Sequence, residues 1–394
     1  MLFQTLDEKK KCVAVYLNGE LLYDQMPSDL TTTWKYASFL GARDIEYASL
    51  YCVGKTIDEV CPDNIKSKWE DVNKKLKAFL ISFNEAGVSL HDNCFFDLVP
   101  ERFLLEYCDL KNKITEDVIN THERPQNYEF LLDLTRVLES IKYQKLNLNF
   151  RNMDKHLGSL ANRSQFKKLT NCSPYISYDI SGTKTGRLTT TKNAFPILTL
   201  NKNYRGIIEP VNDWLIELDF NAAELRTLLA LSGVPQPEED IHEWNAKNVY
   251  GGSMSREEAK KRIFAWLYNP NSKDTLSASA YDRQGVVDKF WQGASVKTIF
   301  NRDIPSDKHH ALNYIIQSTT SDLFLRRMIE IYKSLENKKS FVSFSVHDSL
   351  VIDLAEEERG ILTDIVNTFS QTDLGKFKVN VSAGKDYSSM RKLI

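Results

Sequence analysis

One segment of the sequence is marked at both ends as a helix, and it carries an ordered set of side chains. Ser255 and Glu258 form the Ser-x-x-Glu pattern of a capping box, and Asn269-Pro270 ends the helical pattern. Between these ends, every fourth residue is a cation or an aromatic residue: Arg256, Lys260, Phe264 and Tyr268. Because four residues make slightly more than one helical turn, these side chains line one helix face.

Two cations followed by two aromatic rings fit a ligand with a polyphosphate at one end and a flat ring at the other. A nucleoside triphosphate is such a ligand. Ala259, Ile263 and Leu267 form the opposite stripe, which we expect to face the core. The alternative is an ordinary surface helix, whose cations face water and whose aromatic rings belong to the core. Three further segments favour the first interpretation.

Charge is distributed unevenly along the 394 residues, which are enough for two or three cores. The whole chain has a net charge of −2, but residues 141–206 contain twelve Lys and Arg and only two acids, Asp154 and Asp179. Aromatic residues are interleaved with these cations. Such a stretch in an otherwise acidic chain indicates nucleic-acid binding, with Lys167 and Lys168 among the residues that contact phosphates. The alternative is a solvated loop region.

The cysteines and the lengths of the apolar runs indicate which cellular compartment suits the chain. All six cysteines lie in the first 172 residues without a CxxC pair, and His91-Asp-Asn-Cys94 supplies at most half a zinc site. We therefore expect reduced, structural thiols. No run of 18 apolar residues exists, so we expect no membrane span. The N-terminal MLFQTLDEKKK lacks the features of a signal or transit peptide, which favours a cytoplasmic protein.

The N-terminal part has the pattern of a small α+β domain. Asn18-Gly19 predicts a hairpin over residues 11–24, because this pair favours a two-residue turn. Helical patterns follow near 29–40 and 64–85. We therefore expect an α+β domain over residues 1–95.

The middle of the chain changes character twice. Residues 100–170 follow a helical pattern. Residues 171–210 are rich in Thr, Asn, Gly and Tyr, and predict loops and short strands.

Two strand patterns end at an aspartate. In residues 214–220, apolar side chains alternate on one face, whereas Glu217 and Asp219 lie on the other, and a helical pattern follows. Residues 342–354 predict a hairpin with Asp348 at its tip. Each aspartate could simply form a turn. Together, however, two carboxylates at strand ends could hold the metal pair that two-metal phosphoryl transfer requires.

Five segments, in order, resemble the motifs of family A (DNA polymerase I-like) DNA polymerases over roughly residues 100–394. They are SGTKTGRLTT, LDFNAAELR (motif A), REEAKKRIFAWLY (motif B), ALNYIIQSTTSDL and SVHDSLVID (motif C). The resemblance implies an α+β right-hand polymerase in a short, phage-like form. The expected parts are a thumb over 96–180, a palm over 181–240 and 304–394, and fingers over 241–303.

The resemblance also implies how matching residues act. Asp219, Asp348 and the Phe220 carbonyl would hold two Mg²⁺ ions, for which Mn²⁺ could substitute. Lys260 would contact the phosphates and protonate the pyrophosphate leaving group, and Arg256 would bind the γ-phosphate.

Further residues would contact the substrates. Phe264 would stack on the incoming base or sugar, Tyr268 would guard the templating position, and His242 would contact phosphates. The implied contacts with primer–template DNA involve Arg187, Asn313, Gln317 and, beside the primer end, His347.

Glu224 has two interpretations. It stands three residues after Asn221 and could close a helix cap. In the family, the matching glutamate packs beneath the sugar, bonds the tyrosine that matches Tyr268 and excludes a 2′-hydroxyl group. Two departures from the family pattern are Ser349, where motif C commonly has Glu, and Ala265 and Asn269, which replace glycines in motif B.

Proofreading is not expected from this sequence. A 3′–5′ exonuclease of the family needs an Asp-x-Glu pair on its first strand, and the predicted first strand, KCVAVYL, has no acid. Residues 1–95 are then an exonuclease relic or an unrelated accessory domain. The expected protein is a monomeric DNA polymerase that uses primer–template DNA and dNTPs. Two alternatives remain, a catalytically silent primer–template binding protein and a two-metal nuclease.

Overall fold

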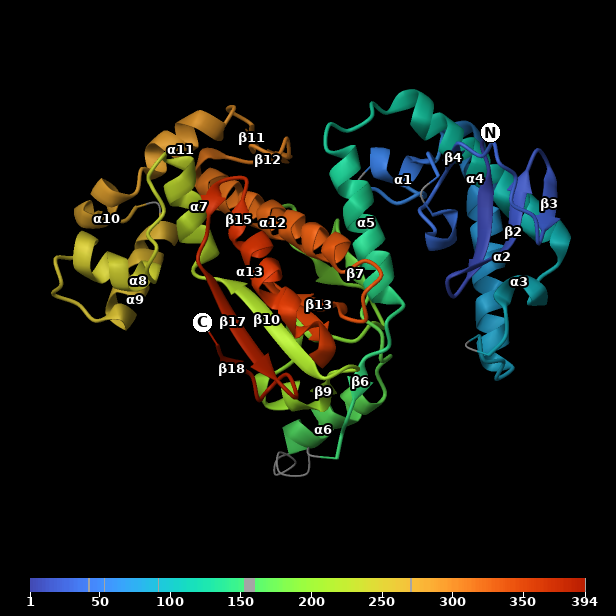
Figure 1. The fold of residues 1–394 in the computed structure, drawn as a ribbon. Helices are drawn as coiled ribbons and strands as arrows, with labels where there is room; N and C mark the ends of the chain where they lie inside the picture. The colour runs from blue at the N-terminus through green and yellow to red at the C-terminus, as the bar shows by residue number, and fades with distance from the viewer. Residues whose placement is uncertain (42, 53, 91, 152–159, 270, 394) are drawn as a thin grey trace. The chain divides into compact units, whose positions relative to one another are not determined.

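The computed structural model describes residues 1–394 except 42, 53, 91, 152–159, 270 and 394. The chain divides into two compact units, Met1–Tyr143 and Gln144–Ile394 (Figure 1). Three residues named in the sequence predictions lie outside the described residues: His91, Asp154 and Pro270.

The N-terminal unit contains a three-stranded antiparallel sheet of order β1-β2-β3, formed by Gln4–Glu8, Lys11–Leu17 and Glu20–Tyr23. Asn18 and Gly19 have φ values of 50° and 92°, the left-handed conformation that a two-residue hairpin turn requires. The predicted hairpin is therefore confirmed. The prediction that KCVAVYL is the first strand is wrong, because β1 precedes it and pairs with it.

Helices complete the N-terminal unit. Its remaining elements are β4 (Thr32–Thr33), a 3-10 turn (Ser38–Leu40), β5 (Glu46–Tyr47), α1 (Ala48–Tyr51), α2 (Asp63–Glu85), α3 (Phe95–Leu98), α4 (Glu101–Thr121) and α5 (Tyr128–Lys142). The helix predicted near 64–85 is confirmed as α2, whereas residues 29–40 form β4 and the 3-10 turn instead.

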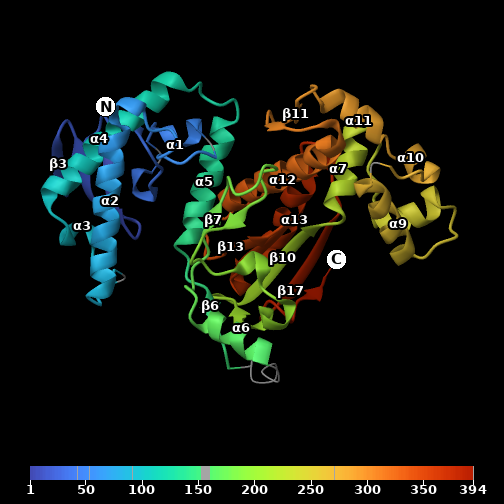
Figure 2. The same cartoon turned by 180° about the vertical axis from the view of Figure 1, so that it is seen from behind.

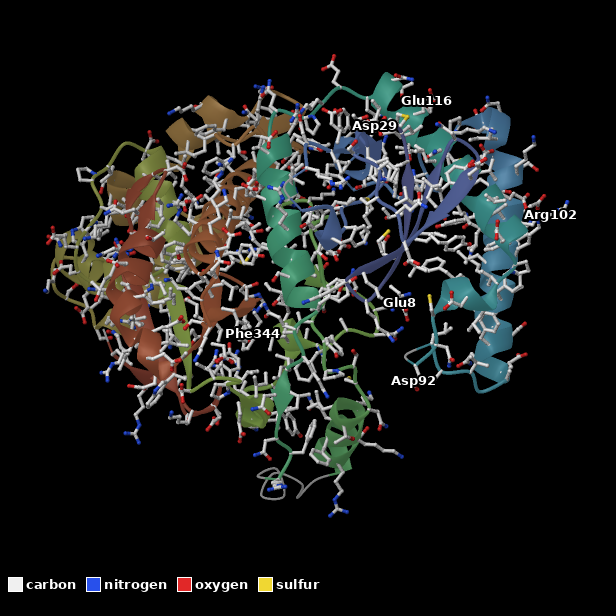
Figure 3. The ribbon with its side chains drawn as sticks, turned by 45° about the vertical axis from the view of Figure 1, so that its right-hand side comes forward. Glu8, Asp29, Asp92, Arg102, Glu116 and Phe344 are labelled. Atoms are coloured by element: carbon white, nitrogen blue, oxygen red, sulfur yellow. The ribbon has the colours of Figure 1, made fainter. Side chains whose placement is uncertain are left out.

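The N-terminal unit extends past the boundary that we predicted at residue 95. Phe103 and Leu104 of α4 are buried in one core with Trp69 of α2, while Arg102 and Glu116 point outward (Figure 3). Because α4 buries this apolar stripe against α2 and the sheet, it belongs to the same unit as they do. The helical segment that we assigned to the thumb therefore begins inside the N-terminal unit.

The C-terminal unit is built on a five-stranded antiparallel sheet of order β13-β14-β10-β17-β18. Its strands are β10 (Trp214–Phe220), β13 (Phe341–Val346), β14 (Ser349–Leu354), β17 (Val379–Gly384) and β18 (Arg391–Lys392). The strand and hairpin predicted around Asp219 and Asp348 are confirmed.

Two helices, α12 (Lys308–Ser334) and α13 (Leu362–Ser370), pack on the sheet (Figure 1). The Phe220 ring stacks on Phe369 of α13 with ring centroids 4.4 Å apart, and Phe324 of α12 meets Phe369 edge-on. This aromatic contact holds the end of β10 in place, because large rings bury much apolar area. The mixture of sheet and helices confirms the predicted α+β class.

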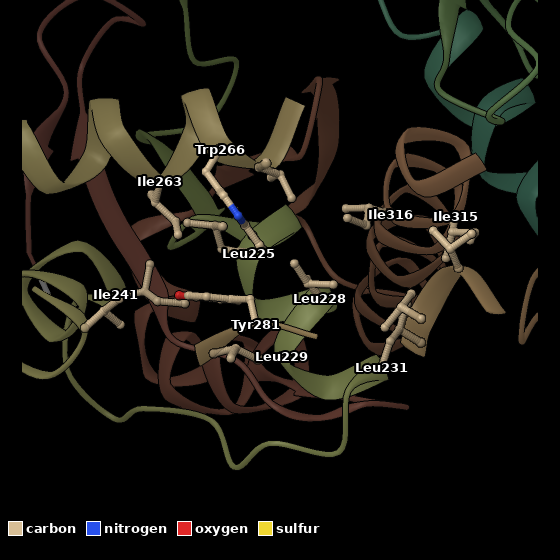
Figure 4. Packing of buried hydrophobic residues seen from close by; sticks show 14 of the residues in the cluster. Leu225, Leu228, Leu229, Leu231, Ile241, Ile263, Trp266, Tyr281, Ile315 and Ile316 are labelled. Carbon is tan, nitrogen blue, oxygen red and sulfur yellow. The ribbon is translucent and has the colours of Figure 1, made fainter. Parts of the chain in front are cut away.

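A helical subregion follows β10. It comprises α7 (Ala223–Leu231), α8 (Ile241–Trp244), a π-helical turn (Asn245–Val249), α9 (Arg256–Tyr268), α10 (Thr275–Ala280), α11 (Arg283–Phe290) and the β11–β12 ribbon (Ser295–Lys297, Asp303–Pro305). Figure 4 shows its core, where Leu225 and Leu228 of α7 meet Ile263 and Trp266 of α9, with Ile316 of α12. This core fixes α9 relative to the sheet.

Shorter elements complete the C-terminal unit. They are β6 (Asn147–Leu148), α6 (Leu160–Thr170), β7 (Tyr178–Asp179), β8 (Thr189–Thr190), β9 (Ile208–Glu209), β15 (Gln371–Thr372), β16 (Gly375–Lys376) and 3-10 turns at Ile197–Thr199, Lys202–Ile207 and Glu356–Ile361. The loops and short strands predicted over 171–210 are therefore confirmed. None of the helices in the described ranges combines the length and the apolar character that crossing a membrane requires.

The outer strand β13 has a side-chain partner along its open edge. The Tyr178 hydroxyl donates to the Ser345 carbonyl at 2.6 Å and accepts from the Ser345 amide at 2.9 Å, and both residues are buried. Figure 2 shows β7 beside β13 in this region. An unpaired strand edge is a site of unwanted association, so Tyr178 both stabilises and protects this edge.

We expect Tyr178→Phe to lower the free energy of unfolding by about 1–3 kcal/mol, because the buried amide and carbonyl groups of Ser345 would lose their partner. The control is Tyr332→Phe, on a partly exposed tyrosine of α12, which should change it by less than about 0.5 kcal/mol. Denaturant unfolding curves measure both values. Equal effects of the two substitutions would contradict this role of Tyr178.

Candidate active site

Strand pairing brings two aspartates to the same end of the sheet. Asp219 of β10 lies opposite Ser349 of β14. Val346 of β13 also lies opposite Ser349, so His347 and Asp348 form the two-residue turn of the β13–β14 hairpin. His347 adopts the left-handed conformation there, with φ of 56°. Asp348 is thus covalently attached to the residue that pairs with Asp219.

The electrostatics of this strand end are those of two carboxylates that repel each other. Burial and the neighbouring Asp348 carboxylate raise the pKa of Asp219 to about 7, while a hydrogen bond from Asn380 Nδ2, at 3.3 Å, opposes the shift. Throughout the described part of the chain, no three His, Cys, Asp or Glu gather in a way that could hold a metal ion. A cation at this end would therefore meet two carboxylates.

A third carboxylate lies farther back on the same strand face. Glu217 precedes Asp219 by two residues, and Glu217 Oε1 accepts hydrogen bonds from Ser349 Oγ at 2.7 Å and from the Tyr387 hydroxyl at 3.4 Å. Ser349 therefore faces the carboxylate of the neighbouring strand. Strand alternation had placed Glu217 and Asp219 on one face, but only the pairing of β10 with β14 identifies Ser349 as the partner.

The helix α9 has the predicted ends and faces. Ser255 and Glu258 form the capping box reciprocally, and Ala259, Ile263 and Leu267 are buried. Tyr268 is 42% exposed, so its ring does not belong to the core, whereas the Phe264 ring packs against the core of the helical subregion.

The four spaced side chains of α9 line its outer face. Lys260 is exposed, Arg256 and Phe264 are half-buried, and the rings of Phe264 and Tyr268 stack in parallel with centroids 6.0 Å apart. Two cations and two stacked rings therefore follow each other along a face that solvent reaches.

His242 of α8 lies beside this stripe, with its ring 5.6 Å from that of Phe264. Burial lowers the pKa of His242 to about 4, with Asp240 opposing the shift and Arg256 and Lys260 adding to it. The imidazole is therefore neutral near pH 7.

Glu224 joins two other residues singled out in the sequence. It accepts hydrogen bonds from the Tyr268 hydroxyl and from Arg187, and its side chain is only 12% exposed. Burial raises the pKa of Glu224, and the Arg187 guanidinium opposes the shift. The helix α7 begins after Ala222, which caps it with no side-chain hydrogen bond, so Glu224 does not close a capping box there.

The remaining predicted residues occupy two other places. Asn313 and Gln317 are half-buried one turn apart on α12, and Asn313 lines a pocket of about 390 Å³ with Trp266 of α9 and His309. Lys167 and Lys168 are exposed on α6. No described contact joins these two lysines to the residues above.

Sequence reasoning missed Asp240, Asn221 and Arg226, which form a buried polar network beside α9. A signal existed for Arg226, since an arginine inside the apolar pattern of α7 must find acceptors when it is buried. Its partners depend on how the chain folds back and could not be found from spacing.

The comparisons agree with this architecture. Residues 297–389 match the model of DNA polymerase family A. DNA polymerase I of Caldicellulosiruptor bescii is 25% identical over 240 residues, which cover 47% of this chain and 28% of that protein, so the chain spans well under half of its relative.

A solved structure shares the fold. The POL domain of Pol1 from M. smegmatis, determined in complex with DNA primer-template and dNTP, superposes with a TM-score of 0.58 at 14% identity, covering 73% of this chain and 76% of that chain. Motif order, the family match over residues 297–389 and the shared fold all point the same way: the C-terminal unit is similar to DNA polymerase family A.

Proposed function

We propose that this protein is a template-directed DNA polymerase that adds dNTPs to the 3′ end of a primer by two-metal-ion phosphoryl transfer. The observation that carries the proposal is that Asp219, in β10, and Asp348, in the turn of the β13–β14 hairpin, lie at the same end of the sheet. Both belong to the same compact unit as the cationic and aromatic face of α9. Phosphoryl transfer depends mainly on positioning and on stabilising charge, which this arrangement would supply.

The donor set of the strand end fits Mg²⁺, and Mn²⁺ could take its place. Carboxylate and carbonyl oxygens are the ligands of hard cations, and the pKa of Asp219 is raised first by burial and then by the neighbouring Asp348 carboxylate, both of which a bound cation would offset. Asp219, Asp348 and the Phe220 carbonyl would hold two ions. When bound, the ions would activate the primer 3′-hydroxyl group and neutralise charge on the leaving phosphate.

The outer face of α9 would bind the incoming dNTP. Arg256 would hold the γ-phosphate, Lys260 would protonate the leaving pyrophosphate, and neutral His242 would donate a hydrogen bond to a phosphate oxygen. Phe264 would stack on the base or sugar, and Tyr268 would cover the templating position. The parallel stacking of Phe264 and Tyr268 supports this role for a continuous aromatic surface.

Primer–template DNA would run along residues outside α9. We infer contacts of Arg187, Asn313 and Gln317 with the minor groove and of His347 with the primer end, while Lys167 and Lys168 would bind backbone phosphates. The M. smegmatis relative was solved with DNA primer-template and dNTP, which supports both partners for this chain.

We also propose that the protein lacks 3′–5′ proofreading. The newly found first strand β1 does carry two acids, Asp7 and Glu8. Since successive side chains of a strand point to opposite faces, these neighbours do not form the Asp-x-Glu pair that shares one face.

We expect Asp219→Ala and Asp348→Ala each to reduce primer extension by at least ~10³-fold, because the ions would lose a ligand, while duplex binding stays intact. The assay uses a labelled primer–template, Mg²⁺ and four dNTPs. Asp364→Ala, an exposed aspartate at the start of α13, is the control and should extend normally.

The same gel separates the alternative functions. Unchanged primer with wild-type protein that still binds the duplex would indicate a silent binding protein, and shortened primer would indicate a nuclease. Substantial extension by either alanine variant would overturn the assignment of the two aspartates.

Glu224 is proposed to exclude ribonucleotides by packing beneath the sugar. We expect Glu224→Ala to raise the ratio of ribonucleotide to deoxyribonucleotide kcat/KM by roughly 10–100-fold, since a 2′-hydroxyl group would no longer be buried without a partner. Glu258→Ala is the control, because it removes a true helix cap and should leave this ratio unchanged. If both variants select sugars like the wild type, Glu224 has no role in selection.

The raised pKa of Asp219 predicts that the free energy of unfolding of the metal-free protein depends on pH. Its folded pKa of about 7 exceeds the ordinary value of 3.8, so the unfolded chain loses this proton first. The contribution of Asp219 to the free energy of unfolding therefore falls as the pH rises from 3.8 to about 7, and it stays low at higher pH.

In EDTA, we expect Asp219→Asn to raise the free energy of unfolding by about 1–2 kcal/mol at pH 8, with the gain shrinking towards pH 4. Asp353→Asn provides the contrast. Burial also raises the pKa of Asp353, but both of its oxygens accept backbone amides, from Val211 and Asn212, so an asparagine there would turn its own NH2 group towards one of these donors and should destabilise the fold. Urea unfolding at several pH values measures both effects. A loss of stability for Asp219→Asn at pH 8 would contradict the raised pKa of Asp219, to which burial and the Asp348 carboxylate both contribute.

A further inference from the structure

One carboxylate connects the end of β10 with the start of α9. Asp240 caps α8 by accepting the backbone amides of His242 at 2.9 Å and Glu243 at 3.1 Å. It also accepts Arg256 Nε at 3.2 Å and Nη2 at 2.9 Å. A fifth donor is Asn221 Nδ2, at 2.8 Å from Asp240 Oδ2. Five hydrogen-bond donors occupy the acceptor sites of the Asp240 carboxylate and fix its orientation.

The charge of Asp240 is maintained despite its partial burial. Its side chain is 18% exposed, and although burial alone would raise the pKa of Asp240, hydrogen bonds from Arg256, Asn221 and the Glu243 amide hold the pKa below its usual range. The Asp240–Arg256 contact is therefore an ion pair with two hydrogen bonds, the arrangement that best fixes a guanidinium.

The other side of the network is anchored in the core. Asn221 directly follows Phe220 at the end of β10, and Arg226, which is fully buried, donates to the Asn221 carbonyl at 2.9 Å and to Asn221 Oδ1 at 3.2 Å. Arg226 also donates to the Pro237 and Glu239 carbonyls at 2.8 and 2.9 Å. These bonds attach the segment that leads to Asp240 to the strand end that bears Asp219.

We infer that Asp240 is a positioning residue that orients Arg256 for the triphosphate and ties it to the strand end at Asp219. The inference rests on the proposed function. Of the five guanidinium N–H groups of Arg256, two bond Asp240 and one bonds Glu257. Two remain to meet phosphate oxygens, on a guanidinium whose orientation Asp240 has already set.

Glu257 provides a matched control on the same guanidinium. It pairs with Arg256 Nη1 at 2.6 Å, but its side chain is 66% exposed, against 18% for Asp240. Water and salt screen such an exposed pair, so it contributes little to orientation. Asp240→Asn and Glu257→Gln each replace a carboxylate by an amide. The pair therefore compares the largely buried Asp240–Arg256 contact with the solvent-screened Glu257–Arg256 contact.

The experiment measures dNTP affinity in complexes with a dideoxy-terminated primer–template, so that binding is read without turnover. We expect Asp240→Asn to weaken dNTP binding about ten-fold or more while changing primer–template affinity less than about two-fold. Glu257→Gln should change both affinities less than about two-fold. Unchanged dNTP affinity in Asp240→Asn would overturn the inference.

A second variant separates orientation of Arg256 from capping of α8. Asp240→Ser keeps an oxygen that can cap the helix but is too short and uncharged to hold the guanidinium, so it should weaken dNTP binding as Asp240→Asn does. Wild-type dNTP affinity in a folded Asp240→Ser protein would show that Asp240 only caps α8, against the inference.

A double-mutant cycle tests whether Asp240 acts through Arg256. In the Arg256→Ala background, Asp240→Asn should cause no further loss of dNTP affinity, whereas a purely structural role predicts additive losses and would refute the inference. If the wild-type protein binds dNTP without extending primers, the proposed function is wrong, but the inference about Asp240 stands. If the wild-type protein binds no dNTP, both the proposed function and the inference about Asp240 are wrong.

Discussion

The convergence of the largely buried Asp219 carboxylate and Asp348 at one end of the sheet is the constraint on which the rest of the site depends. Backbone pairing of β10 with β14 and the two-residue turn of the β13–β14 hairpin force the two carboxylates to one end of the sheet. The stacking of Phe220 on Phe369 keeps this strand end in place. Ionising Asp219 in this arrangement lowers the free energy of unfolding, and bound cations would offset that loss. Functional sites commonly carry such a local cost.

The outer face of α9, where we propose that the dNTP binds, is fixed to the same strand end by polar contacts and by packing. The buried side of α9 packs into the core of the helical subregion, which leaves Lys260 and Tyr268 exposed and Arg256 and Phe264 half-buried. The Asp240–Asn221–Arg226 network then connects Arg256 to the residue after Phe220. Glu224 connects the far end of the stripe, at Tyr268, to Arg187. Both ends of the proposed dNTP site are therefore held from outside α9.

Local signals in the sequence predicted what local physics controls. The capping box at Ser255, the Asn18-Gly19 turn and the alternation before Asp219 depend on residues near in the chain, and all three are confirmed. The strand β1 and the extent of the N-terminal unit were missed, because both are decided by packing against distant segments. The contact between Asp240 and Arg256 and the raised pKa of Asp219 likewise arise only when the chain folds.

The most direct test of the central claim is to locate metal ions by anomalous scattering in crystals of the protein with Mn²⁺, a dideoxy-terminated primer–template and the next dNTP. The account predicts two Mn²⁺ peaks about 4 Å apart, with oxygen atoms of both Asp219 and Asp348 in contact with them. A bound dNTP whose Mn²⁺ ions are held by other residues, with either aspartate outside the coordination sphere, would contradict it.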